Sequence, residues 1–133
     1  IVTPGCLDMV NFGERGSVPE KFAGRLLYQH NPQVTLMRTT PEECAELGRI
    51  LAEKVSAYTA PVTVLLPTKG ISVISAPGGA FHDPAADASL FTAIKTHLNP
   101  RVPLVELNVT INDPAFAEAC ADSLLENIRA CKS

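Results

Sequence analysis

Short apolar runs alternate with longer amphipathic segments three times along this chain. The apolar runs cover residues 34–38, 62–66 and 104–109 and are rich in Val and Leu, which predicts three strands. After each run, apolar residues recur every three or four positions, which predicts an amphipathic helix. Each predicted helix starts where a hydroxyl or carboxylate side chain precedes a proline, at Thr40-Pro41, Asp83-Pro84 and Asp113-Pro114.

The first of these helix starts has the fullest sequence signature. Thr40 is expected at the N-cap and Pro41 at the first helical position, and Glu43 completes a capping box. The apolar stripe that follows ends before Ala60-Pro61. Asp83 and Asp113 are expected to act as caps in the same way.

The order of these elements predicts an α/β fold. Strand and helix alternating with short connections are typical of right-handed crossovers in a parallel sheet flanked by helices. Residues 62–66 are apolar almost throughout, as in a strand buried on both faces, whereas residues 104–109 alternate, as near a sheet edge. Residues 1–33 are less regular and predict loops and short helical pieces. Residues 26–28 fit either a short strand or a helix turn.

The composition narrows the function classes. The chain has 133 residues, of which 46% are hydrophobic, and a formal net charge of −3. A basic patch for nucleic acid is not expected, and no apolar stretch approaches the ~20 residues that span a bilayer. The four cysteines form no C-x-x-C pair, which argues against zinc. Cys44, Cys120 and Cys131 fall within predicted helices, which favours buried thiols in a reducing, cytoplasmic compartment. Because the chain opens on the β-type run Ile1-Val2-Thr3 without Met, we expect a fragment or a processed product.

The carboxyl ends of the predicted strands are the expected place for a ligand. Ligands of open parallel sheets bind there, so residues 3–11, 38–40, 67–82 and 110–113 should share one edge. Within this set, Arg38-Thr39-Thr40 is the best anion candidate. A helix start offers free N–H groups, and these side chains add a guanidinium and two hydroxyls for a phosphate or a carboxylate. A plain capping box beside a surface arginine explains the same residues.

The long loop over residues 67–82 is the second candidate, since loops of this length are functional or disordered. It could cradle a phosphate, with Lys69 as counter-charge and Gly70 and Ser72 beside it. The patterns G-x-x-x-x-G-K-[ST] and G-x-G-x-x-G are both absent. His82 is either a general acid or base at this edge or an exposed loop residue.

Other polar residues on the same edge complete the candidate set. They are Asp8, Asn11 and Asn112. Cys6 lies there too, but no histidine is visibly paired with it, as a nucleophile requires. The three histidines are too scattered to predict a metal site.

Several strings of this sequence resemble a known family. They include residues 3–13 (TPGCLDMVNFG), His30-Asn31-Pro32, residues 34–40 (VTLMRTT) and residues 111–117 (INDPAFA), and they run in order over nearly the whole chain. The family is an uncharacterised bacterial, fungal and plant family that includes the tomato mosaic virus resistance protein. Thr110 and Ser75 depart from it, standing where the family pattern leads us to expect His and Asp.

The resemblance implies a fold and a ligand. It implies the carboxyl-terminal, Rossmann-like subdomain of a two-subdomain protein, a partial domain with a three-layer parallel sheet flanked by helices. The plant member binds ATP and contacts a viral replication protein, and some relatives are fused to a TIM barrel similar to phosphoenolpyruvate hydrolase. By this resemblance ATP with magnesium is the expected cofactor, and a missing N-terminal subdomain is the expected partner.

Three functions remain open at this point. The first is a nucleotide-binding regulatory or interaction domain. The second is an enzyme acting on a small carboxylate or a phosphorylated metabolite, using the polar edge. The third is a structural half-domain whose apolar helix stripes bury against the missing half or a second copy in a homo-oligomer.

Overall fold

Two separate sheets organise the chain, which the computed structural model describes over residues 1–131. The antiparallel sheet has the strand order β1-β3-β2, formed by Met9–Phe12, Val34–Arg38 and Leu27–Asn31. The second sheet pairs β4 (Val64–Pro67) with β5 (Leu104–Leu107) in parallel. Two short 3₁₀ helices, Arg15–Ser17 and Glu20–Phe22, connect β1 to β2.

The sequence-based prediction of one parallel sheet is therefore only partly confirmed. Residues 62–66 and 104–109 do supply the parallel pair, but the prediction that residues 34–38 join it is wrong. These residues form the central strand of the antiparallel sheet because both neighbours come from residues 1–33. A tight turn at Pro32-Gln33, where the Gln33 N–H donates to Asn31 Oδ1 (2.9 Å), folds β2 directly onto β3.

The start of the chain lies against the parallel pair. Val2 forms an isolated parallel bridge to Val64, in which the Val2 N–H donates to the Thr63 carbonyl (3.0 Å) and the Leu65 N–H donates to the Val2 carbonyl (2.9 Å). The prediction that residues 1–3 have strand character agrees with this bridge.

The three predicted helices and their caps are confirmed. They are α1 (Pro41–Ser56), α2 (Pro84–His97) and α3 (Pro114–Ala130). Thr40 and Glu43 form the complete capping box, and Asp83 and Asp113 cap α2 and α3 through their carboxylates. Gly48 lets α1 and α2 approach closely, since a Cβ there would lie 2.5 Å from the Leu90 carbonyl oxygen.

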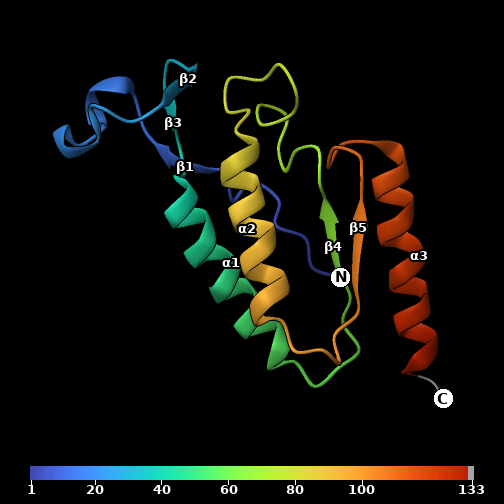
Figure 1. Ribbon diagram of the computed structural model, residues 1–133. Coiled ribbons are helices and arrows are strands. Elements are labelled where there is room, and N and C mark those ends of the chain that lie inside the picture. Colours follow the sequence, from blue (N-terminus) through green and yellow to red (C-terminus); the bar gives the residue numbers. More distant parts are fainter. Residues whose placement is uncertain (132–133) are drawn as a thin grey trace.

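Helices lie on both sides of the parallel pair (Figure 1). On one side α1 and α2 form the main core with alternate residues of β4, Val64 and Leu66, and Lys95 of α2 reaches Glu106 of β5 (3.0 Å). On the other side the Asn127 amide of α3 donates to Thr63 Oγ1 (3.2 Å). Among the described residues, no helix has the length and apolar content to cross a membrane.

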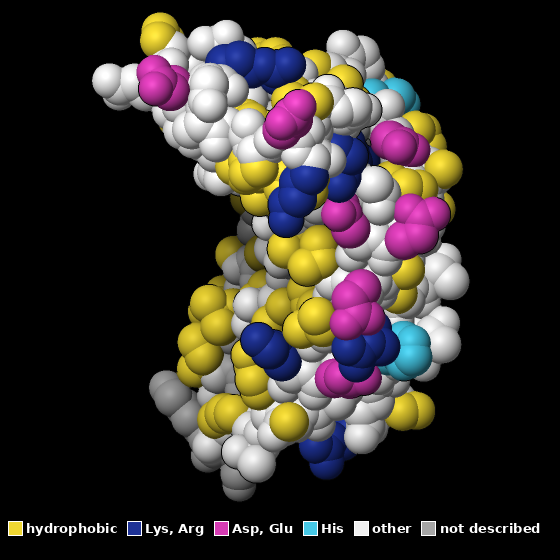
Figure 2. Space-filling view, turned by 90° about the vertical axis from the view of Figure 1, so that its left-hand side faces the viewer, with side chains coloured by type: hydrophobic (Ala, Val, Ile, Leu, Met, Phe, Trp, Pro, Cys, Tyr) yellow, Lys and Arg dark blue, Asp and Glu magenta, His cyan; other side chains and the backbone are white. Residues whose placement is uncertain are grey.

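Charged side chains of opposite sign lie about one turn apart on the outer surface of α1. Arg49 lies between Glu46 and Glu53 and forms an ion pair of 2.6 Å with each. Figure 2 shows acidic and basic side chains lying next to one another on one face of the molecule. Such exposed pairs contribute little to stability, and they mark this face of α1 as solvated.

Candidate functional site

The four segments that follow the strands meet at one edge, as predicted. The Cys6 N–H donates to the Ile71 carbonyl (2.9 Å), and the Thr39 N–H donates to the Asp8 carbonyl (3.0 Å). The Ile111 N–H donates to the Gly70 carbonyl (2.9 Å). These bonds join the loops around residues 6–8, 39, 70–71 and 111, although β3 belongs to the other sheet.

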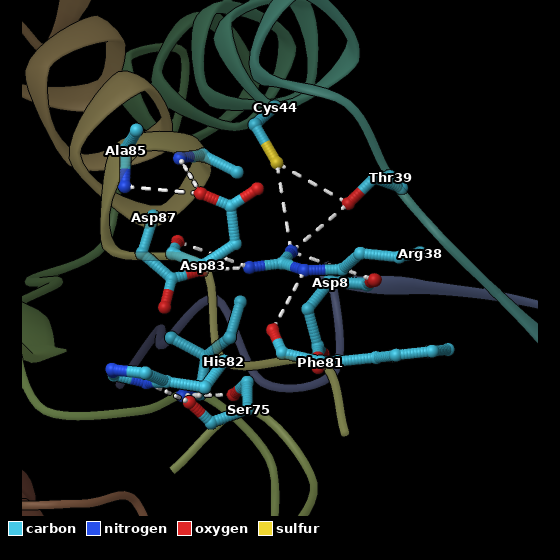
Figure 3. A network of polar contacts seen from close by, with 12 residues as sticks. Asp8, Arg38, Thr39, Cys44, Ser75, Phe81, His82, Asp83, Ala85 and Asp87 are labelled. Atoms are coloured by element: carbon cyan, nitrogen blue, oxygen red, sulfur yellow. Dashed lines mark hydrogen bonds and ion pairs between the residues drawn. The ribbon is translucent and has the colours of Figure 1, made fainter. Parts of the chain in front are cut away.

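Arg38 holds this edge together from inside (Figure 3). It is 4% exposed, and its Nη2 forms a buried ion pair with Asp87 Oδ1 of α2 (2.6 Å). Its Nε donates to the Phe81 carbonyl (3.0 Å), and Nη2 also donates to the Asp83 carbonyl (3.4 Å). Nη1 contacts the Asp8 carbonyl (3.5 Å). One guanidinium therefore ties β3 to the end of the 67–82 loop and to the first turns of α2.

Asp8 is the second buried charge, and it is less fully paired. Its side chain is fully buried, and Oδ2 accepts a hydrogen bond of 2.6 Å from the Ser72 hydroxyl. Oδ1 has no hydrogen-bond partner among the described residues. Ser75 supports Ser72, because its hydroxyl oxygen accepts the N–H groups of Ile71 and Ser72 (3.0 Å each). A carboxylate oxygen that is buried without a donor is costly, so its negative charge is only partly compensated.

One groove opens beside the start of α2, and we call it the Lys69 groove. Its volume is about 210 Å³. Lys69 and His82 are exposed there, and His82 Nδ1 lies 3.1 Å from the Ser75 carbonyl oxygen, which leaves Nε2 toward solvent. The only carboxylate in its lining, Asp87, is paired with Arg38. The lining residues are Thr68, Lys69, Pro77, His82, Pro84, Asp87, Ala88 and Phe91.

A second groove of about 300 Å³, the Cys6 groove, lies between the antiparallel sheet and residues 72–74. Met9 and Asn11 of β1, and Val34 and Leu36 of β3, lie on one face of this sheet, because alternate residues of a strand share a face. The lining residues are Cys6, Met9, Asn11, His30, Val34, Leu36, Ser72, Val73 and Ile74.

The pKa of the Cys6 thiol depends on burial and charge at this groove. Burial, and then the nearby Asp8 carboxylate, raise the pKa of the Cys6 thiol above its ordinary value. The thiol therefore stays protonated at neutral pH, which argues against Cys6 as a nucleophile. Cys6 also adopts a left-handed backbone conformation with φ of 59°, which is uncommon for a residue with a Cβ.

Larger hollows of about 530 and 550 Å³ lie at the opposite, amino end of β4, around residues 57–62. Arg101 is the only charged side chain lining them. We place the candidate chemistry at the two smaller grooves, because these lie where the segments around residues 6–8, 39 and 70–71 meet.

The predicted site residues divide between several positions. Lys69 and His82 line the Lys69 groove, and Asn11 and Ser72 line the Cys6 groove. Asp8, Arg38 and Thr39 are buried beneath them, and Thr39 Oγ1 donates to the Leu7 carbonyl (2.9 Å). Thr40 caps α1, Asn112 is exposed just before α3, and Gly70 bridges to Thr110 with φ of 154°.

This placement changes the reading of the Arg38-Thr39-Thr40 turn. Every nitrogen of the Arg38 guanidinium already has a partner within the chain, and the Thr40 hydroxyl accepts the Glu43 N–H. Arg38 is thus neither a surface arginine nor a free donor. Anion binding at this turn stays a prediction, and it requires these groups to exchange partners.

Sequence reasoning missed two contributors to the site. Asp87 is not among the predicted site residues, although a carboxylate four residues after the N-cap Asp83 can face the preceding strand. His30 is not among them either, but β2 brings it to the Cys6 groove. Recognising the β2–β3 hairpin at Pro32-Gln33 would have placed His30 near Val34 of the neighbouring strand.

Comparisons with known proteins agree on one family. Residues 1–128 match the C-terminal domain of an uncharacterised protein family, UPF0261. A UPF0261 protein of Rhizobium meliloti is 54% identical over 117 residues, which is 86% of this chain and 29% of that protein. A UPF0261 protein of Clostridium tetani is 45% identical over 126 residues, 94% of this chain and 31% of that protein.

A plant protein belongs to the same group of relatives. The ToMV resistance protein Tm-1 of Solanum lycopersicum is 41% identical over 128 residues, which is 95% of this chain and 17% of that protein. The chain thus spans less than a third of the length of each of these relatives. With a match over almost all of its residues, the chain belongs to the UPF0261 family and falls within its C-terminal domain.

Proposed function

We propose that this chain binds a phosphorylated ligand, with ATP the favoured candidate, and serves as a regulatory or interaction domain. The observation that carries the proposal is the Lys69 groove, where the Lys69 ammonium and the His82 imidazole lie beside the start of α2. Thr68 lines the same groove, but its hydroxyl donates to the Leu107 carbonyl (3.1 Å). Lys69 has no ion-pair partner among the described residues, so its charge is available to an anion.

The electrostatics of the groove favour an anion through side chains more than through the helix start. The Asp83 carboxylate already accepts the N–H groups of Ala85 (3.1 Å) and Ala86 (3.0 Å), and Pro84 has no N–H. The α2 terminus therefore contributes mainly its dipole. Arg38 neutralises Asp87, which leaves Lys69 as the dominant charge in the lining.

The size of the groove limits what it can hold. About 210 Å³ accommodates a phosphate group or two, but it is smaller than the pockets that enclose drug-sized ligands. The rest of a nucleotide would lie on other parts of the longer protein. We accordingly assign ATP, with its magnesium, to the intact protein and only the phosphate end to this chain. All four cysteines are free, which fits a cytoplasmic protein.

A thermal unfolding experiment on the intact protein tests this proposal. MgATP, pyrophosphate and inorganic phosphate are added separately at millimolar concentration. A ligand at 100 times its dissociation constant stabilises the folded state by about 2.7 kcal/mol. We expect Lys69→Met to lose most of that gain and Lys54→Met, on an exposed part of α1, to keep it. No stabilisation by any of the three compounds contradicts the proposal.

A second role is supported by the outward face of α3. Leu124, Leu125 and Ile128 are 46%, 49% and 42% exposed, and Phe116 is the one residue of the helix that is buried. Val105 of β5 is also exposed. Figure 2 shows in addition that one side of the molecule is hollowed, with hydrophobic side chains gathered along it. We propose that the rest of the longer protein covers α3.

Hydrogen exchange and light scattering separate the possible occupants of this face. In the intact protein we expect α3 amides to be protected, and Leu124→Asp to remove that protection and lower the melting temperature. Leu26→Asp, at a 52% exposed leucine far from α3 in the chain, is the matched control. Protection that appears only in a dimer assigns the face to a second copy and contradicts the proposal.

A further inference from the structure

We propose that the Cys6 groove binds a small organic amine, with its apolar body on the antiparallel sheet and its ammonium group toward Ser72 and Asn11. This site is separate from the Lys69 groove, and no lining residue is common to both. The proposal therefore stands or falls independently of phosphate binding.

The shape and lining of the groove fit a small ligand. Met9, Val34 and Leu36 form an apolar floor on one face of the antiparallel sheet, and Val73 and Ile74 form the wall. Val73 is 74% exposed, so its methyl groups are free to cover a ligand. A volume of about 300 Å³ lies at the small end of ligand pockets.

Polar groups that could orient a ligand also line this floor. The Asn11 amide, the His30 imidazole and the Cys6 thiol have no hydrogen-bond partner within the described part of the chain. The Asn11 side-chain carbonyl can accept from an ammonium group, and so can an unprotonated imidazole nitrogen. A few such groups in a mainly apolar lining are typical of small-molecule sites.

The charge beneath the groove selects the sign of the ligand. The buried network contains two carboxylates, Asp8 and Asp87, and one guanidinium, that of Arg38. Arg38 forms its ion pair with Asp87, and it reaches only the backbone carbonyl of Asp8. No Lys or Arg lines the groove to offset the Asp8 carboxylate.

Ser72 connects this carboxylate to the groove. Its hydroxyl donates to Asp8 Oδ2 at 2.6 Å and accepts the Ser75 N–H at 3.1 Å, which leaves one lone pair of its oxygen for a ligand, and the same residue lines the groove. A hydroxyl that donates to a carboxylate becomes a better acceptor, because the bonds of a chain polarise one another. An ammonium group that donates to the Ser72 oxygen is therefore stabilised by the Asp8 carboxylate through the Ser72 hydroxyl. Burial raises the pKa of the Cys6 thiol, and the Asp8 carboxylate raises it further.

A matched pair of probes tests the proposal on the intact protein. Phenethylamine and phenylpropionate have the same ring and similar length but opposite charge, and each is titrated at pH 8 while amide resonances are followed by NMR. We expect phenethylamine to shift the resonances of Asn11 and Val73 in a saturable way and to bind at least about tenfold more tightly than phenylpropionate. No saturable shift, or equal binding of both probes, overturns the proposal.

Variants locate the site and its charge. Asn11→Leu should weaken binding of the amine, whereas Gln29→Leu should leave it unchanged, because Gln29 pairs with Thr35 and faces away from Val34 and Leu36. Asp8→Asn should make the two probes bind equally, and Ser72→Ala should weaken the preference. If Asp8→Asn does not fold, the Asn11 and Gln29 pair still decides the outcome. Amine binding that is unchanged by Asn11→Leu contradicts this location.

Discussion

The two grooves share one wall but differ in charge. Residues 68–82 supply Lys69 and His82 to one groove and Ser72, Val73 and Ile74 to the other. Beneath both lies the same buried network, which holds two carboxylates but a single guanidinium; Arg38 pairs with the Asp87 carboxylate and reaches only the backbone carbonyl of Asp8. Because Arg38 pairs with Asp87, the Lys69 groove is left with an uncompensated cation, and the Cys6 groove is left with an uncompensated anion.

The difference shows how one buried arginine can give two neighbouring surfaces opposite preferences. Arg38 pairs with Asp87 and not with Asp8 for a geometric reason. The first turns of α2 hold the Asp87 carboxylate 2.6 Å from Arg38 Nη2, whereas the Asp8 carboxylate accepts a hydrogen bond from Ser72. Burial raises the pKa of Asp87, and the bond from Arg38 opposes that rise. If the pairing determines the contrast, then changes in the network must alter both grooves, and changes outside it must alter neither.

Replacing Arg38 should have the largest effect. Arg38→Met leaves the Asp87 carboxylate and the Phe81 carbonyl buried without their donor, and breaking a buried pair in this way costs about 3–5 kcal/mol. We expect this loss in the free energy of unfolding from urea titration of the intact protein, together with loss of both ligand preferences.

Two comparisons sharpen that result. Arg25→Met removes a more exposed ion pair, with Glu43 at 2.6 Å, and should cost about 1 kcal/mol or less. The double variant Arg38→Met, Asp87→Met should recover part of the loss, because both charges of the pair are gone. A cost for Arg38→Met no larger than that for Arg25→Met would mean that the buried pair is not what supports the two grooves.

The next test of the comparison changes residues 68–82, the segment that lines both grooves. A Cβ on Gly79 would collide with the Ile74 carbonyl oxygen, so Gly79→Ala must displace the turn that carries the Cys6 wall and leads to His82. Overpacking of this kind costs about 1–3 kcal/mol. We expect weaker binding at both grooves, measured by the same titrations. Gly16→Ala, where a Cβ meets open space, should change neither. Binding that weakens at one groove alone would show that the wall is not shared.

The sequence predicts the helices better than the sheets, for a physical reason. Caps are local: Thr40 with Glu43, Asp83 and Asp113 act within one turn, so their spacing is enough to place α1, α2 and α3. Strand partners are not local. The apolar pattern of residues 34–38 fits a strand in either a parallel or an antiparallel sheet. Its partner strands, β1 and β2, lie within residues 1–33, where the hydrophobic pattern shows no clear helix or strand period.

The candidate site shows the same limit. The clustering of post-strand loops could be predicted from strand direction for the segments that follow Val2, β4 and β5, which run parallel. Arg38 joins this cluster although its strand belongs to the antiparallel sheet, which the sequence did not predict. Which groups pair inside the cluster could not be predicted. An arginine beside a helix start reads as a free donor, until its distances to Phe81 and Asp87 show that it is fully engaged.

A smaller effect tests the field at the Cys6 wall directly. Because burial and Asp8 raise the pKa of the Cys6 thiol, alkylation of Cys6 by iodoacetamide at pH 8 should be slower in the folded protein than in urea. Asp8→Asn should speed the reaction severalfold in the folded state, as read by peptide mass spectrometry. An unchanged rate would place the Asp8 charge too far from the groove to select a ligand.

The smallest effect comes from a carboxylate outside both grooves. The hydrogen bond from Arg25, together with the Thr40 N–H, lowers the pKa of Glu43. The ionised Glu43 side chain therefore contributes to the free energy of unfolding above the ordinary glutamate pKa. This contribution is lost as the pH falls through the lower pKa of Glu43 in the folded protein. Since Glu43 is 43% exposed, Glu43→Gln should cost only about 0.5 kcal/mol at pH 7, and the difference in the free energy of unfolding between the two proteins should disappear in acid.

Glu43→Gln makes the same charge change as Asp8→Asn but reaches neither groove, so both probes should bind as before. A shift in the amine preference here would mean that net charge, and not the buried pairing, sets the contrast between the grooves.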